Sequence, residues 1–277
     1  MSILYNVIKR IIRKSRERIV VPVYNPVSNE KILDNKVVMI TGGTGGIGRA
    51  IASAVIKCGG KVILCGTNVH KLEKYTDELG DKVMPLSLNL LDCTSLQDSF
   101  KKGISLFDDN RVDILINAAG VHNDWDFMNF DEEEFDKIMD VNIKGTYCIS
   151  QIIAKYMIEN GIKGHILNLA SSSSLRPAWT PYQISKWAVC GMTKGLADVL
   201  LPYGIIVNAI APGPTATQMV KADSDENLFY YDQPAHRYAT PEEIANLAVF
   251  MVSPMGNMIV GDTYYISGGS GVISYHK

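Results

Sequence analysis

Seven short runs of apolar and β-branched residues recur from Lys36 onward, and longer segments with helical spacing separate them. The runs occupy residues 36–41, 61–66, 83–88, 112–117, 164–170, 204–211 and 263–267. Strands that alternate with crossover helices favour a parallel sheet, because each helix returns the chain to the same edge of the sheet. The sequence therefore predicts an α/β fold, a doubly wound and mostly parallel seven-stranded sheet with helices on both faces.

Three helix starts carry the residues that satisfy free backbone N–H groups. Asp131 is followed three residues later by Glu134, and Thr240-Pro241 by Glu243, which are capping arrangements. Thr180-Pro181 likewise predicts a helix that begins just before Tyr182.

The stretch TGGTGGIG, residues 41–48, follows the first strand directly and opens a helix over about Gly46–Lys57. Its glycines fit two spacings, either Gly42, Gly46 and Gly48 or Gly42, Gly45 and Gly48. Both spacings predict a turn from strand to helix whose free N–H groups hold a pyrophosphate. A dinucleotide is therefore expected with either spacing.

The composition limits which classes of protein this chain can belong to. The chain has 277 residues, of which 47% are hydrophobic and 20% charged, and no apolar run is long enough to span a membrane. Its five cysteines and five histidines are scattered without metal-ligand spacing, so we expect a reducing, cytoplasmic setting and no metal site. One catalytic domain, residues 36–277, is the simplest organisation.

Residues 1–35 differ from this domain. Residues 1–20 carry six basic side chains and one acidic one, which leaves the rest of the chain mildly acidic and argues against a nucleic-acid partner. Their apolar residues have helical spacing, which predicts an amphipathic helix that either contacts an anionic membrane surface or packs on the body or a partner subunit. Residues 21–35 are expected to form a linker.

Further motifs follow in a fixed order. They are NAAG at 117–120, VN at 141–142, a serine cluster at 171–174, YQISK at 182–186 and PG at 212–213. Together with the glycine loop, they resemble the short-chain dehydrogenase/reductase family, with its Rossmann-type fold, over roughly residues 36–270. NAAG and the short gap between Ser171 and Tyr182 resemble its small dehydrogenase/reductase branch rather than the epimerases, and little sequence is left for an epimerase substrate domain. This resemblance favours Gly42, Gly46 and Gly48 as the glycines that form the pyrophosphate-binding turn.

Tyr182 is the candidate general acid/base for hydride exchange between a nicotinamide and an alcohol or ketone. Work near neutrality needs the tyrosine pKa to fall by roughly 3 units, about 4 kcal/mol, and burial alone acts in the opposite direction. Lys186, four residues later on the same helix face, supplies a cation, which is effective only in a partly desolvated cleft.

The resemblance implies three further roles. Ser171 would hold the substrate oxygen, although the spacing leaves Ser172 open. Lys186 would also bind the nicotinamide ribose, and Asn142 would help to anchor a water chain to that lysine.

The resemblance also implies the cofactor contacts, most of which are expected near the carboxyl ends of the strands. They are Gly42, Thr44, Gly45, Gly46, Ile47, Gly48, Gly66, Thr67, Asn68, Asn89, Leu90, Asn117, Ala118, Ala119, Gly120, Tyr182, Lys186, Pro212, Gly213, Thr215 and Thr217. Gly66-Thr67-Asn68 lacks the acidic residue that favours NAD, so NADP is preferred and NAD remains open.

Substrate contacts are expected from the variable positions His122, Trp125, Phe127, Arg176 and Trp179 and from residues 218–238.

The leading function is an NAD(P)-dependent oxidoreductase for a secondary alcohol or ketone. One alternative is a 3-oxoacyl-(acyl-carrier-protein) reductase. Such an enzyme needs a basic patch to bind its acidic carrier protein, and the sequence offers only Arg176 and Arg237 for it. A second alternative is a dinucleotide-binding scaffold protein without catalytic activity. The resemblance also implies a homodimer or homotetramer through the helices at about 131–160 and 181–203.

Overall fold

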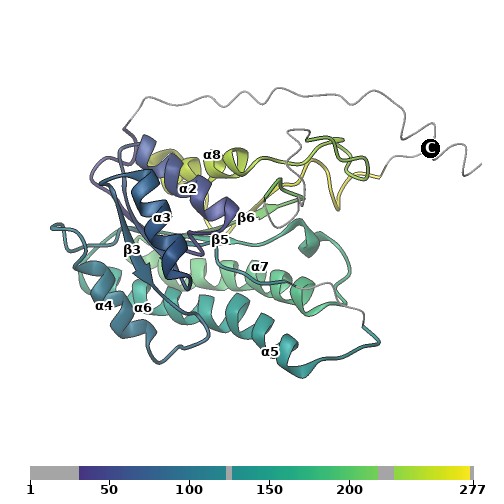
Figure 1. Cartoon of the computed structure of the whole chain (residues 1–277), viewed down its shortest axis with the longest axis horizontal. Helices are drawn as coiled ribbons and strands as arrows, with labels where there is room; N and C mark the ends of the chain where they lie inside the picture. The colour runs from purple at the N-terminus through teal and green to yellow at the C-terminus, as the bar shows by residue number, and fades with distance from the viewer. Residues whose placement is uncertain (1–30, 123–126, 218–227, 275–277) are drawn as a thin grey trace, which may run out of the picture.

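The computed structural model describes residues 31–122, 127–217 and 228–274. A single sheet of seven parallel strands runs through these residues in the order β3-β2-β1-β4-β5-β6-β7. The strands are β1 (Val37–Thr41), β2 (Lys61–Gly66), β3 (Val83–Ser87), β4 (Ile114–Asn117), β5 (His165–Leu169), β6 (Ile206–Pro212) and β7 (Thr263–Ile266). The doubly wound single-domain fold expected from the sequence is confirmed (Figure 1).

Helices cover both faces of the sheet (Figure 1). One face carries α2 (Gly46–Lys57), α3 (Val69–Leu79) and α8 (Pro241–Val252). The other carries α4 (Leu96–Ile104), α5 (Glu132–Met139), α6 (Thr146–Glu159) and α7 (Pro181–Leu200). Short 3-10 turns lie at Ser172–Leu175, Leu201–Tyr203 and Pro254–Gly256.

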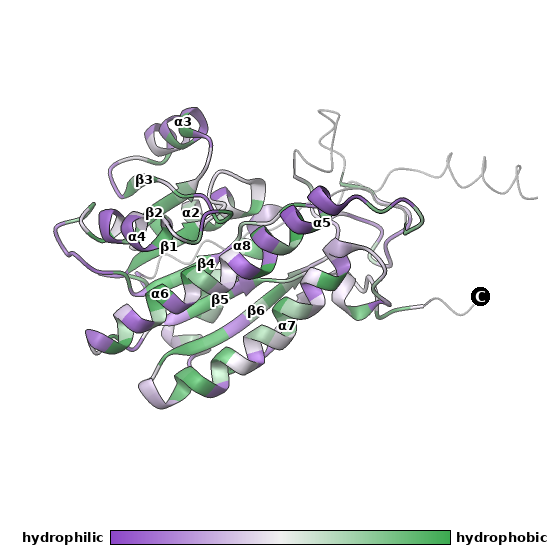
Figure 2. Cartoon of the chain, turned by 90° about the horizontal axis from the view of Figure 1, so that it is seen from below, coloured by the Kyte–Doolittle hydropathy of each residue, from purple (hydrophilic) through white to green (hydrophobic). Residues whose placement is uncertain are grey.

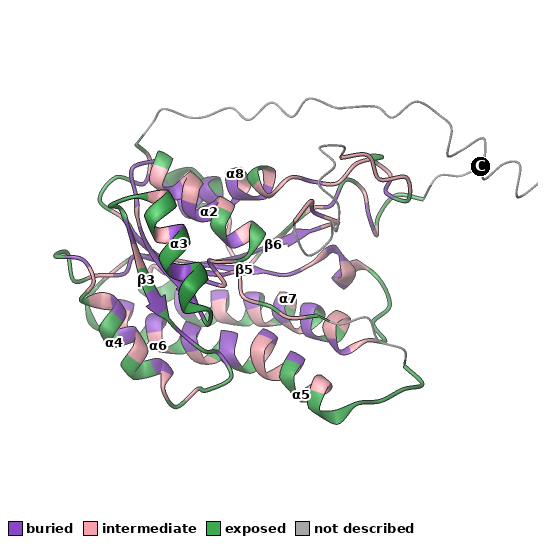
Figure 3. Cartoon of the chain, viewed as in Figure 1, coloured by how far each residue is buried: buried purple, intermediate pink, exposed green. Residues whose placement is uncertain are grey.

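The alternation of side chains along each strand builds two hydrophobic layers. Val38 and Ile40 pack in the cluster beneath α2 and α8, whereas Val37 and Met39 pack in the cluster beneath α4, α6 and α7. Such strands are apolar on both sides because helices cover both faces. Figure 2 shows the apolar strands between amphipathic helices, and Figure 3 shows that they are buried.

The three predicted helix starts are present. The Asp131 side chain accepts a hydrogen bond from the Glu134 N–H at the start of α5. Thr180 and Thr240 each form a complete capping box, and a proline opens both helices. These caps fix where α7 begins and hence where Tyr182 lies.

The helix expected over residues 131–160 is present, but its hydrogen-bond pattern changes midway. A π-helical turn, Asp140–Gly145, separates α5 from α6. Gly145 lies directly against the loop after β3, where an added Cβ would come within 2.4 Å of the Leu90 carbonyl oxygen. This contact spans distant parts of the chain, so local sequence does not predict it. The turn carries Asn142, and π-turns frequently occur at functional sites.

The amphipathic segment expected at residues 1–20 lies outside the described residues. The described part of the chain begins at Lys31, and Leu33 already packs in the hydrophobic core. Among the residues that the structure describes, no helix has the length and apolar character needed to cross a membrane.

Candidate active site

Tyr182 and Lys186 lie one turn apart at the start of α7. The Lys186 side chain is buried, and its Nζ donates a hydrogen bond to the Leu169 carbonyl oxygen at the end of β5, at 2.8 Å. The same Nζ lies 5.6 Å from the centroid of the Tyr182 ring. The helix thus brings a phenol and an ammonium group together at the carboxyl edge of the sheet, where open α/β sheets bind their ligands.

A serine hydroxyl completes this group. Ser171 lies two residues after the end of β5, and its side chain lies close enough to the Tyr182 hydroxyl to lower the pKa of that phenol. Its Oγ also accepts the Ser173 N–H at 3.2 Å. Ser172 is buried at the start of a 3-10 turn. Of the two serines, the geometry therefore favours Ser171 as the partner of Tyr182.

These contacts predict different effects for the two serines. Ser171→Ala should lower kcat about 10- to 1,000-fold, because the family resemblance implies that the Ser171 hydroxyl donates a hydrogen bond to the substrate oxygen. Ser172→Ala should change kcat by less than about 3-fold, a difference of under 1 kcal/mol. Steady-state kinetics of the two purified variants test this, and equal losses would contradict the assignment to Ser171.

Asn142 has its side-chain amide fully engaged. Its Oδ1 accepts the Val121 N–H at 2.9 Å, and its Nδ2 donates to the Val121 carbonyl at 2.9 Å and to the Ser185 Oγ at 3.0 Å. Its amide therefore holds the segment after β4 in place. Sequence reasoning did not identify Ser185; the available signal was its place three residues after Tyr182, on the same helix face.

Burial shifts the two titratable groups in opposite directions. It raises the pKa of Tyr182 above its ordinary value, and the hydrogen bond from Ser171 opposes this effect. It lowers the pKa of Lys186 to about 8. The phenol is therefore a neutral proton donor near pH 7, and the drop that general-base work requires must come from additional positive charge in the cleft.

The glycine loop between β1 and α2 is tightly packed at four positions, one of which is Gly43, where an added Cβ would lie 2.5 Å from the Leu64 Cδ1. An added Cβ would lie 2.6 Å from the Ala119 Cα at Gly42, 2.8 Å from the Thr217 Cγ2 at Gly46 and 2.4 Å from the Gly42 carbonyl oxygen at Gly48. At Gly45 the nearest atom is 3.3 Å away. Only the spacing Gly42, Gly46 and Gly48 therefore matches the positions that exclude a side chain, and this bare turn at a helix N-terminus fits a pyrophosphate.

The other expected cofactor residues have varied surroundings. Thr44 lies against Gly66 at the end of β2, where an added Cβ would be 3.1 Å from its Oγ1. Asn68 caps α3 by accepting the Lys71 N–H, and Asn89 accepts the Leu91 N–H at 3.1 Å. The remaining positions are buried or half-buried Ile47, Leu90, Asn117, Ala118, Ala119, Pro212, Gly213, Thr215 and Thr217 and exposed Thr67 and Gly120.

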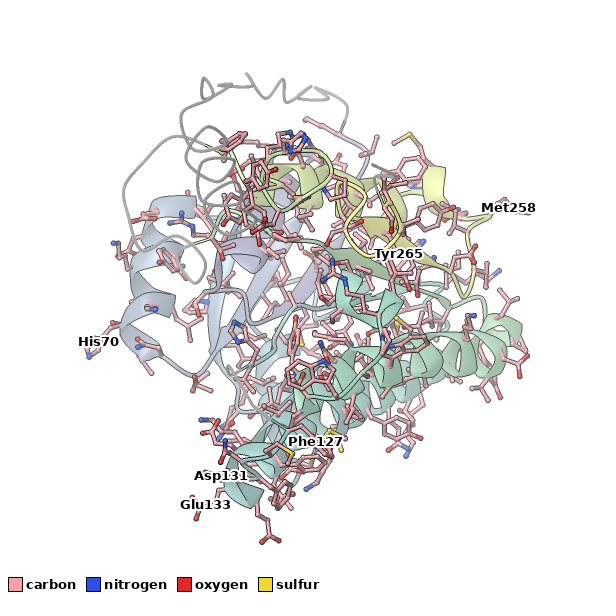
Figure 4. All side chains as sticks on the ribbon, turned by 90° about the vertical axis from the view of Figure 1, so that its right-hand side faces the viewer. His70, Phe127, Asp131, Glu133, Met258 and Tyr265 are labelled. Atoms are coloured by element: carbon pink, nitrogen blue, oxygen red, sulfur yellow. The ribbon has the colours of Figure 1, made fainter. Side chains whose placement is uncertain are left out.

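The candidate substrate residues differ in their contacts and in their exposure to solvent. The His122 ring packs edge-on against Tyr182, with 5.6 Å between centroids. The Arg176 Nη2 donates a hydrogen bond to the Ser270 Oγ at 2.9 Å. Trp179 is half exposed, and Trp125 lies outside the described residues. Figure 4 looks onto the carboxyl edge of the sheet, where Phe127 projects at the border.

No group of three or more histidine, cysteine or carboxylate side chains in the described ranges is arranged to hold a metal ion.

Comparisons with known proteins agree with this geometry. The short chain dehydrogenase family matches residues 36–228. A 3-oxoacyl-(acyl-carrier-protein) reductase of Aquifex aeolicus is 33% identical over 245 residues, which cover 86% of this chain and 98% of the relative. A 3alpha-hydroxysteroid dehydrogenase of Mediterraneibacter gnavus is 35% identical over 248 residues, with 86% and 98% covered.

Solved structures are similar over the same region. A 3-ketoacyl-(acyl-carrier-protein) reductase from Brucella melitensis complexed with NADH superposes with a TM-score of 0.78 at 29% identity, covering 87% of this chain and all of that one. A short-chain dehydrogenase/reductase from Serratia marcescens also gives 0.78, at 28% identity, with 87% and 99% covered. The protein therefore belongs to the short-chain dehydrogenase family of NAD(P)-dependent oxidoreductases.

Proposed function

We propose that the protein transfers a hydride between NADP(H) and a small secondary alcohol or ketone. A bound nicotinamide supplies or accepts the hydride. In reduction, the Tyr182 hydroxyl donates a proton to the substrate oxygen, which the Ser171 hydroxyl holds by a second hydrogen bond. In oxidation, the Tyr182 oxygen takes the proton back. Lys186 provides the positive charge that stabilises the phenolate.

The observation that carries this proposal is the convergence of three groups. The Ser171 side chain lies beside the Tyr182 hydroxyl and lowers the pKa of that phenol, and the buried Lys186 ammonium lies one turn after Tyr182 on α7. The test is NADPH oxidation with a panel of cyclic ketones, steroid ketones, keto sugars and 3-oxo esters. Carbonyl-dependent oxidation of NADPH supports the proposal, and its absence across the panel, in protein that binds NADPH, contradicts it.

The start of α3 supports NADP over NAD. This helix begins after Thr67 and Asn68, and its first turn contains no acidic residue. A helix N-terminus favours an anion, and no carboxylate is present there to repel a 2′-phosphate. Asn68 uses its Oδ1 to cap the helix, which leaves its N–H groups and the exposed Thr67 hydroxyl as donors.

The rival substrate, a 3-oxoacyl chain on an acidic carrier protein, is named for several relatives. The two basic residues that could bind such a carrier protein already have partners within the chain. Arg237 forms a bidentate ion pair with Glu243, and Arg176 donates a hydrogen bond to Ser270. Asp131 and Glu133 instead project at the border of the carboxyl edge (Figure 4). We therefore expect higher kcat/KM with a simple 3-oxo thioester than with the carrier-bound chain, and the reverse would favour the rival.

The rate of reduction should fall above about pH 8. The pKa of Lys186 is lowered to about 8 by burial, so its ammonium is present below that pH and lost above it. Loss of this cation weakens electrostatic support at Tyr182. The pH dependence of kcat at saturating NADPH measures this directly, and a profile that is flat to pH 10 would show that Lys186 keeps its proton.

We further propose a homodimer or homotetramer that uses the faces of α6 and α7. Tyr147, Trp187 and Val199 are exposed apolar residues on these helices. Apolar patches of this kind commonly mark interfaces. Mass measurement in solution tests the assembly, and a monomer at micromolar concentration would refute it.

Residues 1–20 are proposed to contact anionic lipid. This rests on their basic and amphipathic sequence alone. Sedimentation of the full chain with phosphatidylglycerol vesicles, compared with phosphatidylcholine vesicles, tests the proposal, and equal recovery in the two supernatants would remove it.

A further inference from the structure

Ser185 lies between Tyr182 and Lys186 on α7, and its side chain is fully buried. Its Oγ donates a hydrogen bond to the Tyr182 carbonyl oxygen at 2.7 Å and accepts one from the Asn142 Nδ2 at 3.0 Å. The hydroxyl therefore joins α7 to the π-helical turn, two elements that are far apart in the sequence.

Asn142 extends this connection to the segment after β4. Its amide forms a two-way clamp with the backbone of Val121, through N–H to Oδ1 and Nδ2 to carbonyl bonds that are both 2.9 Å long. With the Ser185 bond, both N–H groups of the amide are used. The orientation of this amide is therefore set by Val121 on one side and Ser185 on the other.

The clamped segment touches both reactive side chains. At Gly120 an added Cβ would lie 3.5 Å from the Lys186 Nζ, and the His122 ring packs edge-on against the Tyr182 ring. A displacement of Val121 therefore changes the surroundings of the ammonium and the phenol together.

We propose that Ser185 is a positioning residue, which acts through Asn142 to hold Gly120–His122 against Tyr182 and Lys186. Without the hydroxyl, one N–H of Asn142 is left unpartnered in a buried place, and this drives the amide to turn or admits water. The clamp on Val121 then loosens. The effect on turnover rests on the proposed function, whereas the effect on the clamp does not.

A matched control exists on the same helix. Thr193 is also fully buried, donates to the Val189 carbonyl at 2.8 Å and accepts from the Asn168 Nδ2 at 3.0 Å. Thr193→Val therefore removes the same kinds of bond as Ser185→Ala, two turns away from Lys186. Both variants should unfold at lower temperature than the parent chain.

The test compares hydrogen exchange at the Val121 amide and turnover in these two variants. Ser185→Ala should speed Val121 exchange at least about 10-fold and lower kcat about 10- to 100-fold, with KM for NADPH changed less than about 3-fold, because small displacements impair catalysis more than binding. Thr193→Val should change neither exchange at Val121 nor kcat. Ser185→Thr, which keeps the hydroxyl, should restore both.

Equal exchange at Val121 in the two variants overturns the proposal, as does a loss of kcat with unchanged exchange. If the parent chain reduces no carbonyl, the proposed function fails, and the exchange contrast alone decides on the clamp. If Ser185→Ala does not fold, Ser185→Cys, with its weaker donor and acceptor, serves in the same comparison.

Discussion

Tyr182→Phe should lower kcat by about 100- to 10,000-fold, the range expected for loss of a general acid/base. The change removes one oxygen atom, which is the partner of Ser171 and the proposed proton donor. The ring and its edge-on contact with His122 remain. Binding of NADPH should therefore change by less than about 3-fold, or under 1 kcal/mol. Kinetics with the most active carbonyl of the panel, together with an NADPH titration, measure both quantities.

Tyr156→Phe is the matched control for this prediction. Tyr156 lies on α6, and its hydroxyl donates to the Asn110 carbonyl at 3.1 Å, away from Ser171 and Lys186. Removing that hydroxyl should leave kcat within about 2-fold, because one exposed hydrogen bond contributes little. If Tyr182→Phe kept more than a tenth of the parent activity while Tyr156→Phe behaved as expected, Tyr182 would not be the proton donor.

Gly48→Ala should abolish dinucleotide binding in practice, with affinity reduced at least about 100-fold, or 2.7 kcal/mol. The new methyl group would lie 2.4 Å from the Gly42 carbonyl oxygen and 2.9 Å from the Gly43 Cα. Both are backbone atoms, so the loop itself must move to relieve the contact. Overpacking of this kind also lowers the free energy of unfolding by about 1–3 kcal/mol. Fluorescence titration with NADPH and thermal unfolding measure the two effects.

Gly45→Ala tests whether the effect is specific to the crowded glycines. At Gly45 the backbone has an ordinary negative φ of −78°, and the nearest atom to an added Cβ is 3.3 Å away. We expect NADPH affinity within about 3-fold of the parent chain, which corresponds to under 1 kcal/mol. Similar losses at Gly45 and Gly48 would contradict the assignment of Gly42, Gly46 and Gly48 as the working set.

Much of the fold could be predicted from the sequence because its signals are local. Strands buried on both faces appear as apolar runs, and β2 begins and ends at the residues expected. The caps at Asp131, Thr180 and Thr240 are equally local, since each depends on residues within one turn. The spacing of Tyr182 and Lys186 on one helix face is also a local signal, because the two residues are one turn apart.

Other features depend on contacts between distant segments. The π-helical turn exists where Gly145 meets Leu90, and no local pattern indicates that contact. Arg176 bonds to Ser270, which lies 94 residues further along the chain, and the sequence around Arg176 does not indicate this partner. The full burial of Lys186, which lowers its pKa, likewise follows from packing around α7.

The most direct test of the account is a fluorescence titration of the purified full chain with NADPH and, in parallel, NADH. The glycine loop and the first turn of α3 predict that the folded protein binds NADPH, and binds it more tightly than NADH. Tighter binding of NADH would overturn the NADP preference and leave the oxidoreductase account standing. Binding of neither dinucleotide by folded protein would contradict the account itself.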